Sequence, residues 1–266
     1  KTKKASVQKA KDEIEKKLKE VENQEKPLKE KKEEAEDSLS LLRDLRDSVD
    51  DLKEDFSSFS NFVHKSSDDS DPGKWASEAE DKLEDLISSA SKVVKVINRS
   101  GSDQDILKLL RSSGITNDKL ENVIDGLKKY SDSMDDHQKE FLRLMDEGGD
   151  PEEIDSLREK VIEDSKEALE LFTKDNKFTN DDYEELIGKA DNVIDELEDG
   201  LSQINKGLKQ IEDGKKTLLD KEEEVEDEEE EDDDFNDIEE FNADIDKVLK
   251  GNDNINNSDE FKFFCD

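Results

Sequence analysis

The chain has only two histidines, and their surroundings limit the catalytic and metal-binding chemistry that they could support. Neither His64 nor His137 belongs to a His-Glu-x-x-His pattern, which places two zinc ligands on one face of a helix. Neither has a glutamate three residues before it, as a di-iron helix bundle requires. His137 falls on the apolar side of its predicted helix, which favours a packed or half-exposed histidine. We therefore expect no enzyme activity, no metal and no cofactor.

The most charged segment is residues 220–234, which contains thirteen acidic residues and one lysine. Paired carboxylates for catalysis are not expected here, because nothing would desolvate one acid relative to its neighbours. Three interpretations stay open: a solvated spacer, a surface that docks on a basic protein or on the lysine-rich residues 1–34 of the same chain, and loose calcium binding.

Apolar side chains set among acids follow this run and give a sharper signal. The segment 234–241 resembles the tail with which the leech anticoagulant hirudin binds an exosite of thrombin, although it lacks the proline of that tail. Aromatic and isoleucine side chains can anchor on a basic, partly apolar surface while the acids steer association. The candidate protein-binding residues are Phe235, Ile238, Glu239, Glu240 and Phe241.

The overall charge defines the kind of partner. A net charge of −37 argues against nucleic acid and against anionic membrane as partners, because both would repel the chain. No apolar stretch approaches the length of a membrane span. The natural complement is a protein with a basic surface.

Hydrophobic residues make up only 30% of the chain, yet they recur at helical spacing and never alternate as in a strand. We therefore predict an all-α protein, an elongated bundle of about six or seven helices. A heptad stripe predicts a long N-terminal helix, kinked or divided at Pro27, whose seam closes within a monomer or in a coiled-coil dimer. The stripe consists of Val7, Ile14, Val21, Leu28, Ala35, Leu42, Val49, Phe56 and Val63.

Local composition divides the chain into four segments. We expect the heptad-patterned helix at 1–66, a helical bundle at 67–219, the acidic run at 220–234, and a short amphipathic helix with a tail at 235–266. Each boundary falls where the apolar pattern or the charge changes.

Turn and cap residues place the helices of the bundle. Residues 66–74 are expected to form a loop, and a second helix is expected from about Trp75 to Ile97. Asp150-Pro151 is the clearest helix start, because it combines a capping side chain with a proline at the first helical position. Gly148 is expected to end the helix before it.

Two glycosylation sequons, at Asn98 and Asn256, and a first residue Lys1 in place of methionine are compatible with a processed, secreted chain. Cys265 is the only cysteine, so no disulfide is expected within one chain. We expect the protein to be secreted.

Taken whole, the chain resembles the acidic salivary proteins of culicine mosquitoes known as the 34-kilodalton family. The likeness lies in the lysine-rich start (Lys1-Thr-Lys-Lys), helices rich in Asp, Ser, Glu and Lys such as 75–97, the acidic stretch at 220–234, and the near-absence of cysteine. A merozoite surface antigen of malaria parasites, also acidic and heptad-patterned, is a competing resemblance.

The mosquito resemblance implies a non-enzymatic protein secreted in saliva, which acts by binding a blood protein of the host or a cuticular protein of the insect's mouthparts. Two alternatives come from other classes. One is an anticoagulant that binds thrombin through residues 234–241. The other is an intracellular acidic chaperone of basic proteins such as histones.

Overall fold

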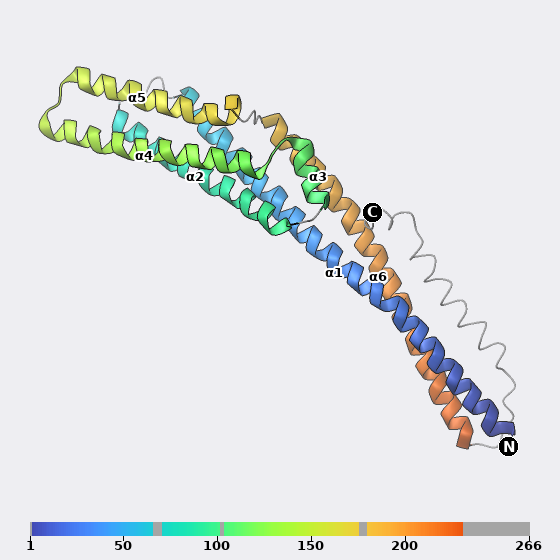
Figure 1. The fold of residues 1–266 in the computed structure, drawn as a ribbon. Coiled ribbons are helices and arrows are strands. Elements are labelled where there is room, and N and C mark those ends of the chain that lie inside the picture. The colour runs from blue at the N-terminus through green and yellow to red at the C-terminus, as the bar shows by residue number, and fades with distance from the viewer. Residues whose placement is uncertain (1, 66–70, 102–103, 176–179, 231–266) are drawn as a thin grey trace. The chain divides into compact units, whose positions relative to one another are not determined.

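The computed structural model describes residues 2–65, 71–101, 104–175 and 180–230 (Figure 1). These residues form six α-helices and one π-helical turn, with no β-strand among them, which confirms the all-α prediction. None of the described helices is both long and apolar enough to cross a membrane. The helices are α1 (Thr2–Lys65), α2 (Pro72–Ser100), α3 (Gln104–Ser113), α4 (Asn117–Glu147), α5 (Pro151–Glu170), which continues into the π turn Leu171–Asp175, and α6 (Asn180–Glu230).

Most helix ends lie where the capping residues predict them. The Asp150 side chain accepts a hydrogen bond from the backbone N–H of Glu152, and Pro151 follows at the first position of α5. Gly148 ends α4 at a φ of 71°, a left-handed conformation that favours glycine. The cap chemistry thus fixes the α4–α5 turn from sequence alone.

The start of α2 differs from the prediction. The helix begins at Pro72, not at Trp75, and Asp71 caps it by accepting hydrogen bonds of 3.0 Å from the backbone N–H groups of Gly73 and Lys74. The expected loop through residue 74 was therefore wrong at its C-terminal end. Asp71-Pro72 is the same aspartate-proline start that opens α5, and it indicates a helix start by the same chemistry.

By packing, the chain divides into two compact units. Unit 1 comprises residues 1–39 and 195–266, and unit 2 comprises residues 40–194. The four segments expected from the sequence follow local composition, whereas these units follow contacts. Helices α1 and α6 consequently each contribute to both units.

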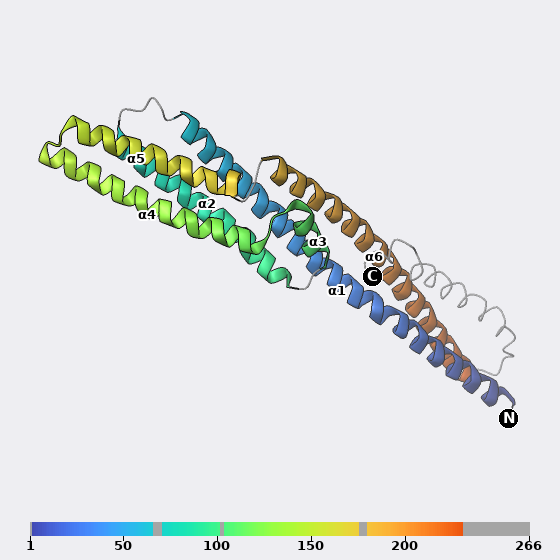
Figure 2. The same ribbon diagram turned by 45° about the horizontal axis from the view of Figure 1, so that its top comes forward.

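The described part of unit 1 is an antiparallel pair made by the first part of α1 and the last part of α6, which lie side by side in Figures 1 and 2. One apolar cluster contains Val21 and Leu28 of α1 with Ile211 and Leu218 of α6. A second cluster, nearer the N-terminus, joins α1 to Val225 of α6. In this structure the predicted seam is therefore closed, over unit 1, by a helix of the same chain.

Val225 belongs to the acidic run, so that run is more than a solvated spacer. Helix α6 continues to Glu230, and Val225 is only 3% exposed where it packs with Val7, Ala10 and Ile14. Val225 lies seven residues after Leu218 and extends the seam of α6 by one more heptad. Docking on the lysine-rich N-terminal helix of the same chain is the interpretation that fits residues 220–225.

Pro27 does not divide α1, which is helical on both sides of it. A proline removes the backbone hydrogen bond to the carbonyl four residues earlier, here that of Asn23. Both residues are exposed, so the freed carbonyl lies on the solvent side of the helix. All nine stripe residues except the half-buried Ala35 are buried, so the heptad register passes through the proline.

An ion-pair network crosses unit 1 beside its apolar seam. Lys215 of α6 bonds Glu25 of α1 and lies 4.0 Å from Glu22, while Lys29 contacts Glu25 from one turn away at 2.6 Å. The hydrogen bonds from Lys215 and Lys29 hold the pKa of Glu25 below its ordinary value. Lys215 and Lys29 thus lie where they offset an acid across the helix pair.

In unit 2, α2 packs antiparallel along the second part of α1. Three contacts in reversed order join the helices: Lys82 to Ser58, Lys92 to Asp51 and Arg99 to Asp44. Helix α4 packs chiefly on α2, and α5 packs on α4, as the side-by-side ribbons of Figures 1 and 2 show.

Aromatic rings close the core of unit 2 where α1, the π turn and the start of α6 meet. Phe56 lies 5.2 Å from Phe172 and 6.0 Å from Tyr183, measured between ring centroids. Phe172 and Tyr183 are both fully buried, and burial raises the pKa of the Tyr183 hydroxyl. This cluster places three aromatic rings in the core of unit 2.

Glu25→Gln should lower the free energy of unfolding at neutral pH, by about 1 kcal/mol, because the charge-assisted bonds to Lys215 and Lys29 are lost. The pKa of folded Glu25 lies below the ordinary 4.5, so its contribution is complete above that pH and is lost as the pH falls through the folded pKa. Urea unfolding at neutral pH and at about pH 3 should show the difference only at neutral pH. The exposed pair of Glu30 with Lys26, at 3.9 Å, supplies the control variant Glu30→Gln. Equal effects of the two variants would contradict the prediction.

Candidate functional site

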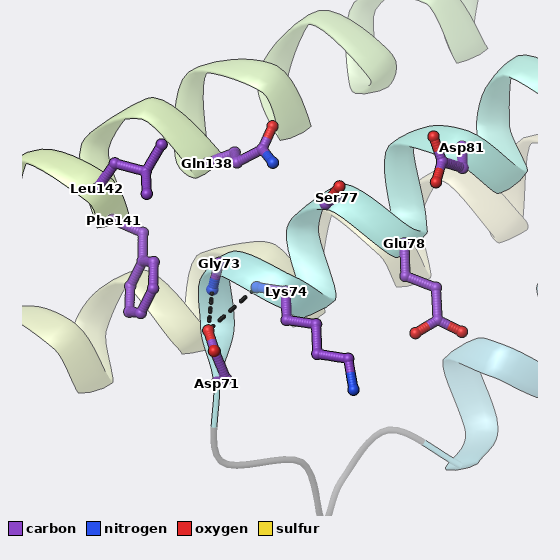
Figure 3. Close-up of a pocket in the computed structure, with 9 residues that line it drawn as sticks. All are labelled: Asp71, Gly73, Lys74, Ser77, Glu78, Asp81, Gln138, Phe141 and Leu142. Carbon is purple, nitrogen blue, oxygen red and sulfur yellow. Dashed lines mark hydrogen bonds between the residues drawn. The ribbon is translucent and has the colours of Figure 1, made fainter.

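A solvent-open hollow of about 400 Å³ lies in unit 2 between the first turns of α2 and the C-terminal half of α4. Figure 3 shows that one wall comes from α2 and its cap, and the other from α4. We call it the α2–α4 hollow. Its lining residues are Asp71, Gly73, Lys74, Ser77, Glu78, Asp81, Gln138, Phe141 and Leu142.

Phe141 and Gly73 hold the two walls together. The Phe141 ring points from α4 toward the first turn of α2 (Figure 3). A Cβ atom placed on Gly73 would lie only 2.0 Å from Cδ1 of this ring and 2.8 Å from its Cγ. Only a residue without a side chain lets the ring approach so closely, so the glycine fixes the shape of the hollow.

One lining residue, Leu142, belongs to an exposed apolar pair on α4. Leu142 and Met145 are each 58% exposed and stand three residues apart, one turn of α4. Among the described residues only one other large hydrophobic side chain is similarly exposed, Leu219 at 53% on α6. Single exposed hydrophobic residues are ordinary on protein surfaces, but a pair beside a hollow indicates a contact surface.

The polar lining is predominantly acidic. Asp71, Glu78 and Asp81 supply three carboxylates, and Lys74 supplies one positive charge. Glu78 and Asp81 are exposed and stand three residues apart on α2. A cation or a basic side chain would find favourable charge on this side of the hollow.

Like charges also meet elsewhere between α2 and α4. Glu80 of α2 is half-buried, and its pKa is raised first by burial and next by the negative charge of Asp135 on α4. Glu84 and Asp81 add to the increase, and Lys139, which bonds Asp135, offsets part of it. The α2–α4 interface therefore carries acidic charge that its own lysine does not fully neutralise.

Away from the hollow, a serine, a histidine and an aspartate meet between α4 and α5. The Nε2 atom of His137 lies 2.9 Å from Oδ2 of Asp164 and 3.2 Å from Oγ of Ser133. The Ser133 hydroxyl itself donates to Asp164, at 2.5 Å. In a nucleophilic triad the serine and the aspartate bond opposite nitrogens of the histidine, whereas here both approach the same one. The cluster joins two helices and does not have the geometry that activates a serine.

The residues singled out in the sequence are placed as follows. His137 is half-buried, as expected, and His64 is exposed, with its Nδ1 atom 2.7 Å from the backbone oxygen of Ser60. Asn98 is exposed in the last turn of α2, where a glycan would meet solvent. The candidate binding residues Phe235, Ile238, Glu239, Glu240 and Phe241, together with Asn256 and Cys265, lie outside the described residues.

The described residues offer few other candidate sites. No group of three or more His, Cys, Asp or Glu side chains there is arranged to hold a metal ion. A second, shallower hollow in unit 1 lies on one face of α6 and includes Leu201, Lys206 and Lys209.

Comparison of the chain with protein-family models, curated proteins and solved structures finds no match.

Gly73→Ala should destabilise the protein by about 1–3 kcal/mol, because the added methyl overlaps the Phe141 ring. Gly188→Ala is the matched control, since Gly188 is an exposed helical glycine with nothing within 4 Å of the added carbon. That variant should gain up to about 1 kcal/mol from improved helix propensity. Urea unfolding of both variants measures whether the free energy of unfolding falls in Gly73→Ala and rises in Gly188→Ala. A rise in Gly73→Ala would contradict the close contact.

Glu80→Gln should raise the free energy of unfolding at neutral pH by roughly 0.5 kcal/mol, because it removes a disfavoured charge. The pKa of folded Glu80 is raised above 4.5, so the penalty is present above the folded pKa and disappears as the pH falls below 4.5. Unfolding curves at neutral and acidic pH test this, with the exposed Glu196→Gln on α6 as control. A loss of stability at neutral pH in Glu80→Gln would be the contrary result.

Proposed function

We propose that the protein is a secreted, non-enzymatic factor that acts by binding another protein with a basic surface. The observation that carries the proposal is the α2–α4 hollow, whose lining combines exposed Leu142 with three carboxylates; exposed Met145 stands one turn further along α4. Protein-binding surfaces characteristically combine apolar anchors with charges that select the partner. The hollow is open to solvent, which suits side chains of a partner better than an enclosed small substrate.

The charge of the whole chain supports the same kind of partner. A net charge of −37 attracts basic proteins over a distance and repels acidic ones. The apolar strips of both units are buried within the chain. A partner protein would therefore contact the exposed faces of the helices. Secretion rests on the resemblance to the salivary proteins and on the sequon at Asn98, which is exposed. A blood protein of the host or a mouthpart cuticular protein is the partner that this resemblance suggests.

The full chain should bind lysozyme, a compact basic protein, and should not bind an acidic protein of similar size. Affinity should fall by at least about tenfold when salt rises from about 0.1 M to about 1 M, because the Debye length shrinks from about 10 Å to about 3 Å. Isothermal titration calorimetry measures both effects. Absence of binding to any basic protein at low salt would reject the proposed function.

A second arm of the experiment separates the anticoagulant alternative. Phe235→Ala with Phe241→Ala, made in the full chain, removes the two aromatic anchors of the hirudin-like segment. Loss of thrombin binding in this variant would favour the anticoagulant. Unchanged lysozyme binding in the same variant would assign recognition to surfaces outside residues 234–241.

A further inference from the structure

We propose that the α2–α4 hollow, together with Leu142 and Met145, docks a basic amphipathic α-helix of the partner protein. The apolar side chains of that helix pack on Phe141, Leu142 and Met145, and its Lys or Arg side chains face Glu78 and Asp81. This inference rests on the proposed function, protein binding, and names the element of the partner and its position.

The spacing of the apolar anchors fits a helix. Leu142 and Met145 form a strip along α4, and Phe141 continues it into the hollow. An amphipathic helix presents its own apolar residues at three- and four-residue intervals, so it can lie against such a strip. Helix-in-groove recognition of this kind needs exposed apolar side chains on the receptor, and two of the three most exposed in the described residues are here.

The site exists before a partner arrives. The contact of Gly73 with the Phe141 ring holds α2 and α4 in place, and Asp71 caps the first turn of α2 through two backbone hydrogen bonds. A preformed surface loses little conformational entropy when it binds, which leaves more of the contact energy for affinity.

The charge of the hollow favours a partner helix with a net positive charge. The lining carries three carboxylates against one lysine, and Glu80 with Asp135 adds negative charge between the same two helices. A lysine or arginine of the partner near Glu78 and Asp81 would relieve repulsion that already acts on the free protein. An acidic helix would increase it.

The same reasoning disfavours two other occupants. Residues 235–250 of this chain have an amphipathic pattern, but they contain five acids and only two lysines. A second copy of the chain would bring another net charge of −37 to the same surface. Both would meet like charge, so the observations favour a basic segment of a different protein.

The two methionines provide a direct spectroscopic test, because one lies at the site and the other in the core. Met145 is 58% exposed, and Met134 is fully buried. In the full chain labelled with ¹³C-methyl methionine, a synthetic leucine–lysine amphipathic helix should shift the Met145 signal and leave Met134 unchanged. A peptide with glutamate in place of lysine should shift neither.

Matched substitutions then measure the contribution of each part. Leu142→Ser with Met145→Ser should weaken binding of the leucine–lysine helix by about tenfold or more, as expected for central anchors. Leu219→Ser, at the other similarly exposed hydrophobic residue, should leave affinity unchanged.

Glu78→Gln with Asp81→Asn should weaken binding and reduce its salt dependence. Their control is Glu196→Gln with Asp199→Asn, an exposed pair with the same residue types and spacing.

The outcomes distinguish this inference from the proposed function. Basic proteins that bind wild type and the hollow variants equally would overturn the docking site while leaving protein binding intact. Failure of every basic probe to bind wild type would overturn both. Self-association of the chain that disappears in Leu142→Ser with Met145→Ser, seen by analytical ultracentrifugation, would assign the surface to a second copy and overturn the proposed occupant.

Discussion

Like-charge repulsion is the constraint under which every packed surface of this protein forms. A chain with 30% hydrophobic residues and a net charge of −37 has little apolar surface to bury against that repulsion. Both units respond with long helices that bury a narrow apolar strip and leave the remaining faces in water. In the described helix pair of unit 1, Lys215 and Lys29 converge on Glu25 and offset an acid at the interface. The limited supply of positive charge is therefore as important to the fold as the apolar residues are.

Sequence patterns predict the features of this fold that depend on local chemistry. Heptad spacing, the Asp150-Pro151 start and the glycine stop at Gly148 all report the conformation of neighbouring residues, and the structure follows them. Two errors have local causes as well. The serine- and aspartate-rich residues before Asp71-Pro72 favour a longer loop in sequence, whereas the structure begins α2 at Pro72. Val225 is a single apolar residue among acids, so local charge conceals that it is in register with Leu218 and packs on α1.

The candidate site could not be predicted in this way, because it depends on which helices become neighbours. In the sequence, Phe141 is one more apolar residue on the buried side of α4. Its close contact with Gly73 depends on the packing of α2 against α4. The sequence does contain one signal. Phe141-Leu142 and Leu144-Met145 are adjacent apolar pairs, and two adjacent residues of a helix cannot both face the same narrow apolar strip. A binding site for a basic partner also needs the acidic side chains that α2 contributes, and the sequence does not show that α2 lies beside these residues of α4. Acids that repel one another at this interface cost stability, and proteins commonly tolerate such a cost where a surface has a function.

The division of α1 and α6 between the two units has a consequence for the order of events during synthesis. Unit 2 is one continuous stretch, residues 40–194, so all of its helices can pack as soon as that stretch has emerged from the ribosome. Unit 1 pairs residues 7–28 with residues 211–225, so the first part of α1 has no partner within its own unit until residues 211–225 have been made. Its closure joins segments far apart in sequence, which is the slow class of contact. The lysine-rich residues 1–34 of the nascent chain thus stay available to other proteins until the last part of α6 has been made.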